Sequence, residues 1–307
     1  MDTEVKNTIS AEEQEAQYDA SAKRLLGQKI ILAHILVSTV DDFKNMTPKE
    51  AAECIEGDPK IGSVPVEPGH TNQKHNGGKI AGLNGESAEH NEGLIRFDIV
   101  FYVRLKDGLS QIIVNVEAQK DMPTEYHILN RAIFYACRLV SSQKERDFVN
   151  KKYDDIKQVY TIWICMNMPE DSTDYYYLAN KKVLGNCRWE GKQDLLNIVL
   201  LGLARELPGQ DKKHELHRLL GALLSKKLSQ NEKLNIIEKE YDIPLEEDLR
   251  KDVSVMCNLS QGIVDDTKAE IILNMFKKGY TLEQIADVTE KSISEIEKIV
   301  KKEPAMA

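Results

Sequence analysis

The stretch from Leu94 to Gln119 carries the strongest structural signal in the chain. It reads LIRFDIVFYVRLKDGLSQIIVNVEAQ, with two arms rich in Val, Ile, Phe and Tyr around Asp107-Gly108. These residue types favour β-strands, and Asp-Gly accommodates the positive φ angles of a type I′ turn. The stretch therefore predicts a β-hairpin, and we expect the rest of the chain to be organised around it.

The predicted turn fixes which residues of the two arms face each other. A two-residue loop gives four apolar pairs: Phe97 with Ala118, Ile99 with Val116, Phe101 with Val114, and Val103 with Ile112. Side chains alternate along a strand, so the other face carries the polar residues. On that face Asp98 is expected opposite Glu117, with Cβ atoms roughly 4.5–5.5 Å apart. Two carboxylates at that spacing repel one another, so the pair calls for a cation.

The acidic pair has two interpretations. A solvated polar face is the commoner explanation for any single acidic residue on a strand. A metal site is favoured here because several polar side chains cluster at one end of a face that could otherwise carry Val or Thr.

Composition limits the classes of partner. The formal net charge of −9 argues against a broad nucleic-acid surface, so any DNA contact must be local. The five cysteines are scattered and form no CxxC pair, which indicates neither a disulfide framework nor a zinc site. No apolar run of membrane-spanning length and no leader-like segment is seen, so we expect no membrane association and a cytoplasmic location.

The segment before the hairpin divides into three parts. Residues 1–17 are polar and are expected to be disordered. From Asp19 to Phe43 apolar residues recur at helical spacing, which predicts one long amphipathic helix. From Thr47 to Glu92 the chain is rich in Gly and Pro, which predicts a long loop with a short helix over Pro48–Glu56.

After the hairpin the pattern predicts a helix and then further strands. Thr124 is a candidate cap for a helix that runs to about Gln143. Its expected apolar line is Leu129, Ile133, Ala136, Cys137 and Val140. Three strand candidates follow at Gln158–Met166, Asp174–Leu178 and Leu195–Leu203, the last of which could equally be a buried helix. The first should run parallel to the second arm of the hairpin, because a strand, helix and strand form a right-handed crossover.

Residues 208–307 form a region that is expected to be all-α. Helices are predicted over His214–Lys227 and Leu245–Cys257, with a capping box at Ser229 and Glu232 between them. In the tail, Thr281 with Gln284 and Ser292 with Glu295 have the spacing of two more helix caps. The tail resembles a helix-turn-helix, although a plain helical hairpin explains it as well.

Four segments together resemble a known family. RFDI, NVEAQ, RAIFYACRLVSSQ and VYTIWICMN are similar to the PD-(D/E)XK family of transposase-like, recombination-promoting nucleases. The resemblance implies a restriction-endonuclease-like α/β core over residues 18–207, a mixed sheet flanked by helices. Gln119 stands where the catalytic Lys of the wider superfamily usually lies, and the adjacent Lys120 should point to the opposite face.

The resemblance also implies a chemistry. A Mg²⁺ ion, which Mn²⁺ can replace, would be held by Asp98, Glu117 and the backbone carbonyl of Ala118. Such an ion polarises a phosphoryl oxygen and activates water. Gln119 would orient that water. The auxiliary candidates are Glu92, Arg131, Arg138 and Gln143. The expected activity is hydrolysis of DNA during recombination, with DNA as partner and a homodimer as an assembly.

Two other functions remain open. The acidic net charge and the missing Lys favour a DNA-binding or protein-interaction module that keeps the nuclease fold without turnover. A two-carboxylate glycosidase is a more distant third, because carboxylates directly opposed on adjacent strands suit a metal better than a sugar bond.

Overall fold

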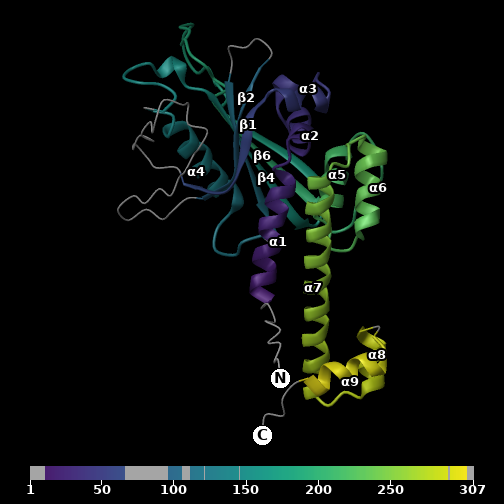
Figure 1. Ribbon diagram of the computed structural model, residues 1–307. Helices are drawn as coiled ribbons and strands as arrows, with labels where there is room; N and C mark the ends of the chain where they lie inside the picture. The colour runs from purple at the N-terminus through teal and green to yellow at the C-terminus, as the bar shows by residue number, and fades with distance from the viewer. Residues whose placement is uncertain are drawn as a thin grey trace, which may run out of the picture.

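The computed structural model describes residues 11–65, 96–105, 111–120, 122–144, 146–289 and 291–302 (Figure 1). The helices in chain order are α1 (Ala11–Leu26), α2 (Lys29–Thr39), α3 (Pro48–Glu53), α4 (Ile128–Ser141), α5 (Glu215–Leu224), α6 (Gln230–Tyr241), α7 (Glu247–Lys277), α8 (Leu282–Thr289) and α9 (Ile293–Lys302). Short 3₁₀ turns are η1 (Asp41–Phe43) and η2 (Tyr153–Asp155). The strands are β1 (Ile55–Pro65), β2 (Arg96–Arg104), β3 (Gln111–Gln119), β4 (Gln158–Met168), β5 (Ser172–Tyr177) and β6 (Leu196–Ala204).

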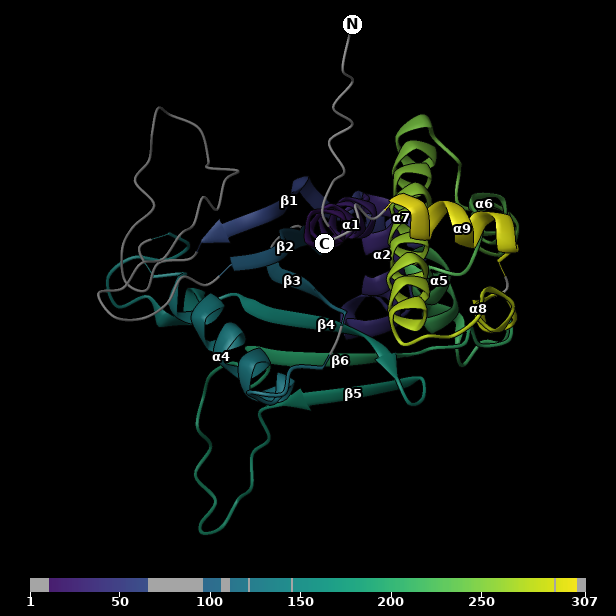
Figure 2. The same cartoon turned by 90° about the horizontal axis from the view of Figure 1, so that it is seen from below.

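The strands form one mixed, six-stranded sheet in the order β1-β2-β3-β4-β6-β5 (Figure 2). The strands β3, β4 and β6 run parallel to one another, whereas β1, β2 and β5 run antiparallel to their neighbours. The expected α/β class, with a mixed sheet flanked by helices, is therefore confirmed.

The predicted hairpin register is confirmed for three of the four expected apolar pairs, and the fourth, Phe97 with Ala118, is not part of the ladder. Residues pair across β2 and β3 as Ile99 with Val116, Phe101 with Val114 and Val103 with Ile112. The predicted turn at Asp107-Gly108 lies outside the described residues.

Helices cover both faces of the sheet. On one face α1, α2, α5, α6 and the first part of α7 pack against the side chains of Ile99, Val114, Ile162 and Val199. On the other face α4 packs against a smaller core around Trp163. Tyr102, Asn115 and Glu117 alternate onto the α4 face. Asp98 lies at the end of the β2–β3 ladder, where its side chain bonds the backbone of β3 and is reached by Lys23 of α1.

The expected single helix over 19–43 is wrong, because the chain breaks between α1 and α2 at Gly27 and Gln28. Ile61 of β1 lies against this break, and a Cβ on Gly27 would be 2.4 Å from Ile61 Cδ1. The break lets β1 pass close to the backbone there. The expected disorder of residues 1–17 is also corrected, since α1 already begins at Ala11, while residues 1–10 lie outside the described part.

The expected loop over 47–92 contains an unpredicted edge strand. After the predicted short helix, which is α3 with a capping box at Thr47, the chain enters β1 and pairs with β2. Its Gly and Pro content suggested a loop, but edge strands tolerate both, and the ladder is interrupted by register shifts between Glu56 and Lys60 and between Ile61 and Val64.

The helix after the hairpin is present but is shorter than expected. It starts after His127 and not at Thr124, and His127 makes no side-chain cap. Its buried residues are Ile128, Ala132, Tyr135, Ala136, Arg138 and Leu139. Of the expected apolar line, Ile133 and Cys137 are exposed. The helix carries two neighbouring apolar lines, and the one with Tyr135 packs on Trp163.

The later strands follow the sequence well. The strand β4 is parallel to β3, β5 forms the edge, and the ambiguous segment at 195–203 is the strand β6. Burial on both faces explains its nearly continuous apolar sequence.

The region after residue 208 is helical, and its first part packs with the sheet. The helices α5 and α6, and the start of α7 as far as Met256, share the main core with the sheet. The predicted helix over 245–257 continues to Lys277, so α7 is 31 residues long. At its far end Ile272, Ile285 and Ile296 form a separate small core with α8 and α9 (Figure 1). No described helix is both long and apolar enough to cross a membrane.

Candidate functional site

The acidic pair lies where β2 and β3 separate. The last paired residues at this end of the two strands are Ile99 and Val116. Beyond them, side chains replace the backbone ladder: the backbone N–H of Asp98 donates to Glu117 Oε1 at 3.1 Å, and the N–H of Ala118 donates to Asp98 Oδ2 at 2.9 Å. The two carboxylates therefore hold the opened end of the hairpin together.

The cation that the acidic pair calls for is Lys23 of α1. Its Nζ lies 2.8 Å from Asp98 Oδ1 and 2.6 Å from Asp19 Oδ2. The sequence does not point to Lys23, because only tertiary structure brings α1 to the hairpin. Its one local signal is that it follows the buried Ala22 at the edge of an apolar helical stripe.

Glu117 is the most enclosed charge of the site. It is 4% exposed, and Asn115 Nδ2 donates to the same Oε1 atom at 3.1 Å. Both described hydrogen bonds of Glu117 end on Oε1. Burial and then the nearby charge of Asp98 raise the pKa of Glu117 well above its usual range. Burial also raises the pKa of Asp98, although Lys23 acts in the opposite direction. Burial is thus the main reason that both carboxylates hold their protons more tightly than usual.

Of the two candidate arginines, Arg131 is the one whose charge acts on Glu117. Its Nη1 and Nη2 donate to the hydroxyls of Tyr126 and Tyr135 at 2.7 and 2.8 Å, and the guanidinium lies 5.4 Å from the ring centre of Trp163. The positive charge of Arg131 partly opposes the rise in the pKa of Glu117. These aromatic contacts fix a cation at the edge of the site.

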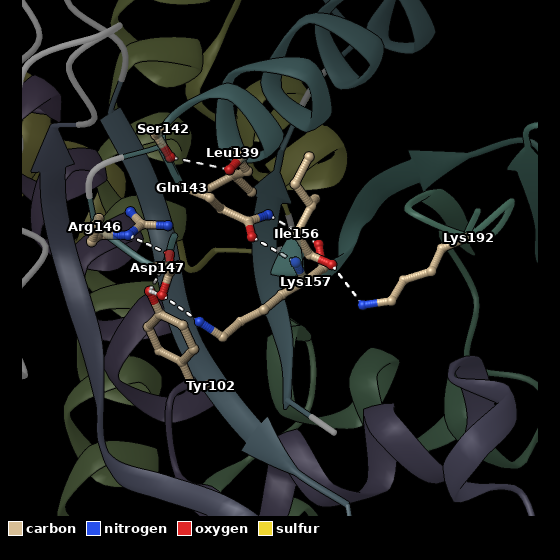
Figure 3. A network of polar contacts seen from close by, with 9 residues as sticks. All are labelled: Tyr102, Leu139, Ser142, Gln143, Arg146, Asp147, Ile156, Lys157 and Lys192. Carbon is tan, nitrogen blue, oxygen red and sulfur yellow. Dashed lines mark hydrogen bonds and ion pairs between the residues drawn. The ribbon is translucent and has the colours of Figure 1, made fainter. Parts of the chain in front are cut away.

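Arg138 and Gln143 occupy other positions. Arg138 is two turns further along α4, which is about 10 Å, and its buried side chain lies over Phe134. Gln143 is at the opposite end of the sheet, where its side chain bonds the backbone N–H and C=O of Lys157 at 2.8 and 3.0 Å (Figure 3). The structure therefore does not bring Gln143 to the acidic pair, and its side chain anchors the chain before β4. Glu92 lies outside the described residues.

The residues after Glu117 alternate as expected. Gln119 shares the carboxylate face, while Lys120 lies on the other side, where it lines a cavity of about 460 Å³. Tyr18, Asn167 and Arg205 line the same cavity, which lies at the carboxyl ends of β3, β4 and β6. Lys120 therefore cannot replace the missing Lys of the Glu-x-Lys pattern.

The site offers oxygen donors of the kind that a Mg²⁺ ion requires. Among the described residues, no three His, Cys, Asp or Glu side chains form a metal-binding group. Mg²⁺, however, is often held by one or two carboxylates, with water and substrate phosphate completing the shell. Asn115 Oδ1 is enclosed beside Glu117 and has no hydrogen-bond partner in the described structure, so it can accept from a water molecule. Two hard oxygen donors, excess negative charge and an unused acceptor fit such an ion.

Comparisons of the chain with family models, with curated proteins and with solved structures found no match.

Proposed function

We propose that this protein is a Mg²⁺-dependent DNA endonuclease of the transposase-like PD-(D/E)XK type. The observation that carries the proposal is the pair of enclosed carboxylates at the opened end of a central hairpin, in a mixed sheet flanked by helices. Glu117 is held there at an energetic cost, since its pKa is raised, and a bound cation would offset that cost. The resemblance of RFDI and NVEAQ to that family supports the same reaction.

Asp98, Glu117 and the carbonyl of Ala118 would hold the ion, with Mn²⁺ able to take its place. When bound, Mg²⁺ supplies a Lewis acid for the phosphoryl oxygen and a water of lowered pKa. Both Asp98 oxygens already accept hydrogen bonds, from Lys23 and from the N–H of Ala118, so binding requires Lys23 to give up its contact.

Lys23 and Gln119 together would take over the role of the catalytic lysine that the wider superfamily usually has where Gln119 stands. Gln119 shares the face of Glu117 and can orient water, but it carries no charge. Lys23 brings a positive charge to Asp98 from a different element. Arg131, fixed by Tyr126 and Tyr135, is the second cation that can bind a phosphate oxygen of DNA.

One observation favours the second candidate function, a module without turnover. The ion pair between Lys23 and Asp98 neutralises part of the site without any metal. In a protein of this kind the hairpin and the carboxylate contacts would serve stability alone, and Mg²⁺ would leave that stability unchanged.

A nicking assay on supercoiled DNA separates the two candidates. Wild type, Asp98→Asn and Glu117→Gln are assayed with Mg²⁺, with Mn²⁺ and with a chelator, and Glu53→Gln serves as the matched control on an exposed carboxylate. We expect wild type and Glu53→Gln to nick DNA only with metal, and both site variants to fall to background. Metal-independent nicking, or equal nicking by all four proteins, would exclude the proposed site.

A further inference from the structure

The loop between β5 and β6, residues 178–195, exposes apolar side chains at its far part. Val183, Leu184 and Trp189 are 85%, 95% and 88% exposed. Figure 2 shows this loop extending from the sheet beyond β5. Single exposed apolar residues are common, but a tryptophan exposed to this extent forgoes the burial that usually stabilises it. These side chains are therefore placed to contact a partner.

The same loop is cationic in an acidic chain. It carries Lys181, Lys182, Arg188 and Lys192 against Glu190 and Asp194, whereas the whole chain has a formal charge of −9. Lys181, Lys182 and Arg188 make no ion pair with any residue that the structure describes. This is the local cluster that an acidic protein needs in order to approach a polyanion.

The base of the loop is anchored and its turns depend on glycine. Lys192 Nζ donates to the carbonyl of Ile156 at 3.0 Å (Figure 3). Gly185 and Gly191 have φ angles of 73° and 132°, which other residues rarely adopt. Tyr177, 68% exposed, ends β5 directly before the loop and adds a second aromatic ring. The loop thus carries one exposed tryptophan and three cations, and an exposed tyrosine precedes it at the edge of the sheet.

We propose that the β5–β6 loop binds single-stranded nucleic acid, an inference that rests on the proposed nuclease function for its biological substrate. Trp189 and Tyr177 stack on unpaired bases, and Lys181, Lys182 and Arg188 contact the phosphates. Base–aromatic stacking combined with backbone cations is the usual basis of binding to single strands without sequence preference. An acidic peptide would match the cations but would offer no flat rings to the two aromatic residues.

The loop lies away from the carboxylates, which defines its role on the substrate. It joins the strands beside the Ile112 end of β3, roughly 17 Å along the strand from Glu117 and roughly 10 Å across β4 and β6. The loop would therefore hold the substrate several nucleotides from the bond that is cut. Its loss should weaken binding without changing the metal dependence of cleavage.

Tryptophan fluorescence tests this site directly. The chain has two tryptophans, of which Trp163 is 1% exposed and Trp189 is 88% exposed. An oligothymidylate is titrated into the full-length protein without metal, so that binding is measured apart from cleavage. We expect the solvent-exposed, red-shifted emission to be quenched and the buried emission to remain. Trp189→Ala should lose between about 5-fold and 150-fold in affinity, and Trp189→Phe should keep most of it.

Charge variants provide the second readout. Lys182→Gln should weaken binding and lower the slope of log affinity against log salt by about 0.7. Lys239→Gln, on the exposed side of α6, is the matched control and should change neither.

Unchanged affinity of Trp189→Ala would overturn the proposal, as would tighter binding to duplex DNA than to oligothymidylate, or binding only to vesicles of anionic phospholipid. These results are distinct from failure of the nuclease proposal. Binding at Trp189 without any metal-dependent nicking would support this inference and contradict the nuclease proposal. Metal-dependent nicking that Trp189→Ala leaves unchanged would support the nuclease proposal and contradict this inference.

Discussion

Asp98 and Glu117 each accept a hydrogen bond from the backbone of the other's strand, at 2.9 Å from the N–H of Ala118 and 3.1 Å from the N–H of Asp98. This reciprocal contact gives both carboxylates a structural role in addition to any chemical one. Amide substitutions keep an acceptor oxygen for these bonds, whereas alanine would remove it. Asn and Gln are therefore the informative replacements at this site.

Glu117→Gln should stabilise the metal-free protein at neutral and higher pH. The folded-state pKa of Glu117 is raised, so its favourable contribution is present below the unfolded value of about 4.5 and is lost as pH rises through the folded value. Gln keeps the acceptor and carries no charge. Melting temperatures measured from acid to alkaline pH should show a gain for the variant that grows with pH. A gain that is independent of pH would show that Glu117 is not a buried charge.

Lys23→Gln should destabilise the metal-free protein by about 1–2 kcal/mol, because Asp98 loses its cation in a partly exposed position. Mg²⁺ should then stabilise this variant more than wild type, since the ion no longer competes with Lys23. Chemical unfolding with and without Mg²⁺ measures both effects.

The control for Lys23→Gln is a double-mutant cycle. Combined with Asp98→Asn, the loss from Lys23→Gln should be smaller than in wild type, because their ion pair is already broken. Additive losses would show that Lys23 acts through Asp19, its other partner, and not through Asp98.

Arg131→Gln should lower cleavage by about tenfold, with little change in fold, because the half-buried side chain, whose charge acts on Glu117, would lose a phosphate contact. Arg138→Gln is the comparison on the same helix and should lower stability and not cleavage, since Arg138 is buried two turns away. Nicking rates and melting curves of both variants test this. Equal effects of the two variants on cleavage would contradict the assignment of Arg131.

The central hairpin could be predicted because local rules determine it. The alternation of apolar residues sets the faces, and a two-residue turn sets the register, so Ile99 and Val116 could be paired from sequence alone. The same rule places Asp98 near Glu117, but the ladder ends at Ile99 and Val116, and side-chain bonds link the two strands beyond that point. The C-terminal caps at Ser229 and Ser292 were equally predictable, because a capping box needs only four consecutive residues.

The features that could not be predicted from the sequence depend on contacts between segments that are far apart in the chain. Lys23 reaches Asp98 only after α1 and β2 pack together, and no local pattern requires it. The break at Gly27 depends on the close approach of Ile61 from β1. The Gly and Pro content of β1 predicts a loop, although an edge strand tolerates both residue types. Gln143 was placed at the site from its helix alone, but α4 is long enough to reach the other end of the sheet.

The small core at the end of α7 should unfold separately from the sheet. Ile285 is fully buried there against residues of α7 and α9, none of which belongs to the main core. Ile285→Ser should cost about 2–4 kcal/mol locally and increase proteolysis within residues 279–302, while the main melting transition stays in place. A lowered main transition would show that the two cores fold as one unit.

Calorimetric titration of Mg²⁺ into the protein tests the central claim most directly. Wild type should bind the ion saturably and release protons, because binding ionises Glu117, whose pKa is raised. The proton release is measured by repeating the titration in buffers of different ionisation enthalpy. Glu117→Gln and Asp98→Asn should lose the binding, and Glu53→Gln should keep it. Equal binding by all four proteins, or no binding by wild type, would contradict a metal site between Asp98 and Glu117.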